Sequence, residues 1–135
     1  MKYFDACQNV VFVQECGHYY NCIAASSSLT QKYRPNLFEL KMYLNEELER
    51  HLNSLQTLSK EEQDAFYCYV ASNGLTCLEK AILDSKLEPE ALIRRLEEML
   101  NHALFYESLL KAGFIPDRFC PYLEYIRNRD YINII

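Results

Sequence analysis

The sequence has 135 residues and a net charge of −5; half of its residues are apolar and a quarter are charged. This length fits one domain, and this composition excludes an intrinsically disordered chain. No basic run exceeds two residues and no apolar run approaches the ~20 residues of a membrane span, so we expect neither nucleic-acid binding nor membrane insertion.

The first third of the chain predicts two helices, over residues 2–16 and 18–33. Gly17 separates them, and Pro35 ends the second because the residue before a proline is pushed out of helical geometry. Residues 10–13 are rich in valine and could instead form a strand. Helix is favoured because the sequence offers no second strand to pair with, but both readings stay open.

A third helix is predicted over residues 37–55, with Asn36 as a favourable N-cap. Its leucines recur at steps of three and four residues, which predicts a buried seam on one face. The seam consists of Leu37, Leu40, Leu44, Leu48, Leu52 and Leu55.

Ser59 and Glu62 form the pattern of a capping box, which predicts a fourth helix over residues 60–72. The pair at residues 73 and 74, Asn-Gly, is expected to close this helix in the left-handed conformation that these residue types tolerate. Thr76 and Glu79 then predict a second capping box and a short fifth helix.

Residues 89–113 predict one long helix that begins with Pro89 and ends at Gly113. Glu107 and Lys111 stand in the favourable acid-before-base order, four residues apart. The last two turns are apolar nearly all round, so a further helix over residues 117–127 should cover them. The fold class that follows is all-α, a single domain over residues 1–135 with six or seven helices in a bundle or paired-helix stack.

The six cysteines contain no CxxC pair, and the amino terminus lacks the apolar core of a signal peptide. We therefore expect reduced thiols and a cytoplasmic location. No P-loop, Rossmann glycine pattern, GxSxG or HExxH is present, so the sequence predicts no cofactor.

One alternative is a cysteine hydrolase or transferase. If a helix begins near His18, Cys22 lies in its first turns, where the helix dipole can lower a thiol pKa. His51 is the best candidate base, with Glu47 one turn earlier to orient it. Structural packing also explains Cys22 and His51, and we favour that interpretation for both residues.

A second alternative is a structural zinc site. Cys7, Cys16, His18 and Cys22 are four soft ligands within sixteen residues. Their spacing matches no zinc finger or ribbon, so metal binding is disfavoured and no metal is predicted.

The strong helix patterns and weak catalytic signals together favour a non-enzymatic protein–protein interaction domain. Such a domain would be a small acidic adaptor, regulator, inhibitor or effector that offers an apolar or tyrosine-rich helix face to a protein partner, or to another copy of itself. The carboxyl-terminal tail is the predicted contact segment. Its candidate residues are Tyr131, Ile132, Ile134 and Ile135.

Overall fold

The computed structural model describes residues 34–55 and 57–134. The chain divides into two units, Met1–Gln31 and Lys32–Ile135, and the described residues belong to the second. This part is all-helical, with no strand among the described residues, which confirms the predicted all-α class. The helices predicted over residues 2–16 and 18–33 lie outside the described residues, so the strand-or-helix question at residues 10–13 and the single domain over residues 1–135 stay predictions.

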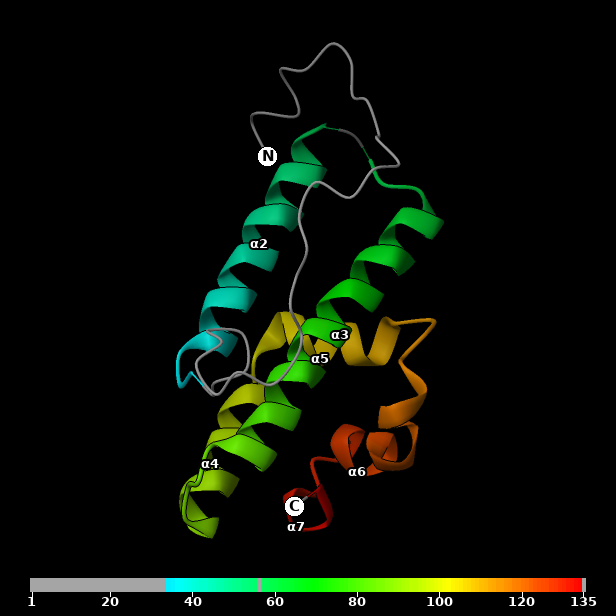
Figure 1. The fold of residues 1–135 in the computed structure, drawn as a ribbon. Helices are drawn as coiled ribbons and strands as arrows, with labels where there is room; N and C mark the ends of the chain where they lie inside the picture. Colours follow the sequence, from blue (N-terminus) through cyan, green and yellow to red (C-terminus); the bar gives the residue numbers. More distant parts are fainter. Residues whose placement is uncertain (1–33, 56, 135) are drawn as a thin grey trace, which may run out of the picture. The chain divides into compact units, whose positions relative to one another are not determined.

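The elements of the described part follow one another in this order: α2 (Leu37–Leu55), α3 (Lys60–Asp84), α4 (Pro89–Leu100), α5 (Ala103–Lys111), the 3-10 helix η1 (Asp117–Tyr122), α6 (Leu123–Arg127) and α7 (Tyr131–Ile134). Helix α3 is the central element, because α2, α4 and α5 all pack against it. Helices α2 and α3 run antiparallel side by side (Figure 1). None of the helices in the described part combines the length and apolarity needed to cross a membrane.

Helix α3 runs unbroken through the predicted Asn73-Gly74 stop, so the prediction of two separate helices there is wrong. It begins as predicted, with the full Ser59–Glu62 capping box. Gly74 has no positive φ. A Cβ atom at Gly74 would lie 2.1 Å from Cε2 of Phe105. The glycine therefore serves the close approach of α5, and Thr76, instead of capping a new helix, donates its hydroxyl to the Ser72 carbonyl at 2.8 Å.

The predicted long helix over residues 89–113 is broken into α4 and α5 at Asn101 and His102. His102 has extended backbone angles (φ −68°, ψ 118°), although neither proline nor glycine stands at the break. Its ring packs edge-on against Phe38 at 5.7 Å, and the neighbouring Phe105 ring packs on Phe38 at 5.5 Å. Tertiary packing around Phe38 thus overrides a continuous helical pattern.

The predicted leucine seam of α2 is not its buried face. The buried residues are Phe38, Met42 and Asn45, while Leu40, Leu44 and Leu55 are exposed. Successive four-residue steps drift by about 40° around an α-helix, so a row of such steps winds away from any one face. The leucines accordingly pass from the solvent side of α2 at Leu40 to partly buried positions at Leu48 and Leu52.

The carboxyl-terminal segment covers α5, as the sequence predicts. The Tyr106 hydroxyl donates to the Arg127 carbonyl at 3.0 Å, and the Arg127 guanidinium donates to the Leu109 carbonyl at 3.2 Å. The segment opens as a 3-10 helix with Pro121 inside it, and the α-helix begins only at Leu123. A proline ring clashes with the carbonyl four residues earlier in an α-helix, so Pro121 disfavours a regular α-helix over residues 117–122.

A polar clamp between a largely buried Arg95 and a half-exposed Glu39 joins the start of α2 to α4. Both guanidinium nitrogens of Arg95 reach the Glu39 carboxylate, one of them at 3.0 Å, and that nitrogen also donates to the Pro35 carbonyl at 2.6 Å. The hydrogen bonds from Arg95 hold the pKa of Glu39 below its usual range. On α5 the predicted Glu107–Lys111 pair is confirmed at 2.6 Å.

Replacing Gly74 by alanine tests the close approach of α5. We expect Gly74→Ala to lower the free energy of unfolding by about 1–3 kcal/mol, because the new methyl group collides with a fully buried ring. Urea denaturation measures this change. Gly113→Ala is the control, since nothing lies within 4 Å of a Cβ there. Alanine is intrinsically the better helix former by about 1 kcal/mol, so a stabilised Gly74→Ala variant would contradict the contact.

Glu39→Gln tests the clamp through pH. At neutral pH the free energy of unfolding of the variant should be lower than that of the parent protein by no more than about 1 kcal/mol, because the carboxylate is half-exposed and screened by solvent. The stabilising form is the carboxylate, so its contribution is present above the ordinary pKa of 4.5 and lost as pH falls through the lowered pKa. Denaturation curves at several pH values should therefore converge for the two proteins in acid; a constant difference down to pH 3 refutes the linkage.

Candidate functional site

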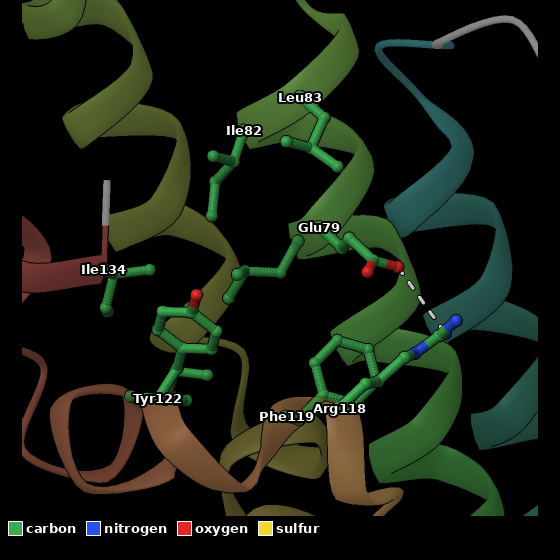
Figure 2. A pocket seen from close by; sticks show the side chains of 9 residues that line it. Glu79, Ile82, Leu83, Arg118, Phe119, Tyr122 and Ile134 are labelled. Carbon is green, nitrogen blue, oxygen red and sulfur yellow. Dashed lines mark ion pairs between the residues drawn. The ribbon is translucent and has the colours of Figure 1, made fainter.

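A pocket of about 240 Å³ lies between α3 and the carboxyl-terminal helices (Figure 2). Helix α3 supplies one wall and η1, α6 and α7 supply the other. The lining residues are Leu78, Glu79, Ile82, Leu83, Arg118, Phe119, Tyr122, Ile126 and Ile134.

The floor of the pocket is apolar and built from buried core residues. Leu78 and Ile82 stand one helical turn apart on α3 and so face the same way. Opposite them, Phe119, Ile126 and Ile134 are buried in η1, α6 and α7. The rim is exposed at Leu83, whose exposed fraction is 73%. The hollow thus opens from the hydrophobic core to the surface.

One ion pair stands at the rim. The Arg118 guanidinium lies 3.5 Å from the Glu79 carboxylate and 3.4 Å from the Thr76 hydroxyl, to which it donates (Figure 2). It also covers the ring of Phe119, with 4.6 Å between the guanidinium carbon and the ring centroid. Because both charged groups are partly exposed, the pair that links η1 to α3 contributes little stability.

The pocket suits an apolar group about the size of one large side chain. Sites for drug-sized molecules and cofactors usually measure about 300–1,000 Å³, and this pocket falls below that range. Arg118 and Glu79 neutralise each other, and Glu79 is the only acid that lines the pocket in the described part of the chain. Besides Glu79 and Arg118, the polar groups among the lining residues are limited to the hydroxyl of Tyr122, in the part of the chain that the structure describes.

A second hollow, of about 520 Å³, is a groove between the carboxyl-terminal half of α2 and the amino-terminal half of α3. Its lining is apolar except for one carboxylate. The groove residues are Leu48, Leu52, Leu55, Leu58, Glu62, Ala65, Phe66 and Tyr69. We refer to this feature as the α2–α3 groove.

The residues of the predicted catalytic alternative are not all within the described part. Cys22 lies outside it. His51 is half-buried on α2, and the carboxylate of Glu47 pairs with Arg50 at 2.6 Å. The proposed orienting carboxylate thus already has a cationic partner. The catalytic hypothesis stays a prediction, because Cys22 lies outside the described residues.

All four residues of the zinc alternative, Cys7, Cys16, His18 and Cys22, also lie outside the described residues. Within residues 34–55 and 57–134, no group of three or more potential ligands could hold a metal ion. The zinc hypothesis stays untested.

The predicted contact tail is only partly surface. Ile134 is buried and lines the pocket, whereas Ile132 has an exposed fraction of 78%. Tyr131 is half-buried, and burial raises the pKa of its hydroxyl. Ile135 lies outside the described residues. In the tail, Ile134 therefore forms part of the pocket wall, and Ile132 exposes an apolar side chain.

Sequence patterns did not reveal the polar residues between α2 and α5. Asn45 is buried, and within the described part its side-chain amide nitrogen has no hydrogen-bond partner. His102 lies with its Nε2 atom 3.5 Å from the Glu46 carboxylate. Sequence periodicity relates residues three or four positions apart on one helix, whereas Glu46 lies on α2 and His102 at the start of α5.

Comparison of the chain with known protein families, curated proteins and solved structures gave no match. The candidate functional sites are therefore the pocket and the α2–α3 groove.

The described thiols should differ in reactivity. Cys77 is buried, and burial raises the pKa of its thiol, whereas Cys120 is exposed. We expect iodoacetamide at pH 8 to alkylate Cys77 at least about tenfold more slowly than Cys120, because the thiolate is the reacting form. Peptide mass spectrometry over a time course measures both rates. Equal rates in the folded protein would contradict the burial of Cys77.

Proposed function

We propose that this chain is a non-enzymatic protein–protein interaction domain, a small adaptor or regulator that holds an apolar side chain of a partner protein. The observation that carries the proposal is the pocket between α3 and η1–α6–α7, with its apolar floor, exposed rim and side-chain size. We also propose that it acts in the cytoplasm, which is consistent with three free thiols among the described residues.

The partner segment would place one large apolar residue in the pocket. Interfaces gain most of their affinity from a few such anchors in desolvated pockets, surrounded by contacts that exclude water. Leu83 and Tyr122 would supply those surrounding contacts, with the exposed Ile132 of the tail as a further apolar side chain on α7. The paired Arg118 and Glu79 offer a donor and an acceptor for the partner backbone.

Peptide display on the full chain tests the proposal. We expect selected peptides to share one large apolar residue and to bind with dissociation constants of about 1–100 μM, as befits a single small anchor site. Leu83→Lys should weaken binding by about tenfold or more, because it places a charge at the mouth of the pocket. Fluorescence anisotropy with the purified variant gives the affinity.

Leu110→Lys is the matched control. Leu110 is an exposed leucine near the end of α5, as Leu83 is near the end of α3, and lysine is favourable at both helix ends. Melting temperatures of both variants should stay within a few degrees of the parent protein. Selected peptides without a common apolar residue, or equal binding to both variants, would show that the pocket is not the contact site.

A further inference from the structure

We infer that the α2–α3 groove binds a basic amphipathic helix of a partner protein. This inference concerns a different surface from the pocket, and neither depends on the other.

The groove has the form that receives a helix. Its walls are two antiparallel helices, α2 and α3, which lie side by side (Figure 1). Phe66 is buried, Leu48 and Leu52 are partly buried, and Leu55 and Tyr69 are exposed at the edge. An amphipathic helix can lay the apolar residues of positions i, i+3, i+4 and i+7 along such a surface.

The drift of the α2 leucine row creates this groove. The row starts on the solvent side of α2 at Leu40, away from the core face of Phe38 and Met42, and reaches the α3 side at Leu48, Leu52 and Leu55. These leucines therefore contribute apolar surface that the described helices do not fully cover. An apolar surface of this kind, bordered by charged residues, is typical of an interaction site.

The charge beside the groove selects the partner. Residues 46–64 contain six acidic and two basic side chains, a net charge of −4 out of −5 for the whole chain. One of the two basic residues, Arg50, is already paired with Glu47. One of the acidic residues, Glu62, lines the groove itself.

Lysine or arginine residues flanking an apolar stripe would complement the net negative charge of residues 46–64. Complementary charge also accelerates association and rejects wrongly charged partners. A second copy of this chain, itself at −5, fits the acidic border poorly, as does an anionic membrane surface. The charges thus favour a basic helix over these other occupants.

Fluorescence anisotropy with a synthetic helix tests the inference. The probe is an 18-residue peptide with leucines at helical spacing and lysines elsewhere; its counterpart carries glutamate in place of every lysine. We expect the full chain to bind the lysine peptide with a dissociation constant of about 1–10 μM and the glutamate peptide at least about 100-fold more weakly. Raising the salt from 50 to 500 mM should weaken the first complex.

Two neutral substitutions locate the binding surface. Leu55→Gln should weaken binding of the lysine peptide by about tenfold, whereas Leu110→Gln should leave it unchanged, since the two leucines have similar exposed fractions of 59% and 56%. Leu83→Gln, in the pocket, should also leave it unchanged, so failure of this inference and failure of the proposed function remain distinguishable.

Four results would overturn the inference. Equal affinity for the two peptides removes the charge argument, and equal effects of Leu55→Gln and Leu110→Gln show unspecific adhesion. Light scattering that reveals a dimer of the parent protein but a monomer of Leu55→Gln assigns the groove to self-association. A large loss of melting temperature in Leu55→Gln, with no peptide binding to the parent protein, shows that the groove is filled from within the chain.

Discussion

The contact between the Phe105 ring and the backbone of α3 at Gly74 is the constraint on which the described fold depends. No side chain could stand at Gly74 without displacing a fully buried ring. The glycine costs helix propensity in the middle of a 25-residue helix, and close packing of α5 offsets that cost. Phe38 closes the same cluster from α2 through its edge-on contact with Phe105.

The break at His102 follows from this packing. If α4 continued as a straight helix, residues 103–111 would follow the direction of α4. The extended backbone angles at His102 instead let α5 turn and pack against α3. The C-terminal segment then covers α5 through Tyr106 and Arg127. Because α6 is held by α5 and the Arg118–Glu79 pair links η1 to α3, side chains of η1 and α6 face α3, and the hollow left between them is the pocket.

Two hollows of different character therefore open on this helical body. The pocket has a neutral rim, since Arg118 and Glu79 are paired, and its size suits one side chain. The α2–α3 groove is larger and lies beside a concentration of acidic residues. The apolar lining of each hollow determines which side chains it can bury, and the charge beside the hollow determines which partner is compatible.

The sequence alone determined the helical class, the bounds of α2, the capped start of α3, the proline start of α4 and the Glu107–Lys111 pair, because each depends on neighbours within one helical turn. It did not reveal the hollow between α3 and the carboxyl-terminal helices. Only the tertiary structure decided that Gly74 continues a helix, that His102 interrupts one, and that Leu40 and Leu44 of α2 face solvent. The Arg118–Glu79 pair joins residues 39 positions apart, which no local pattern connects. All of these features depend on which helices pack against each other. Helical periodicity shows which residues share a face of a helix, but it does not show which element packs against that face.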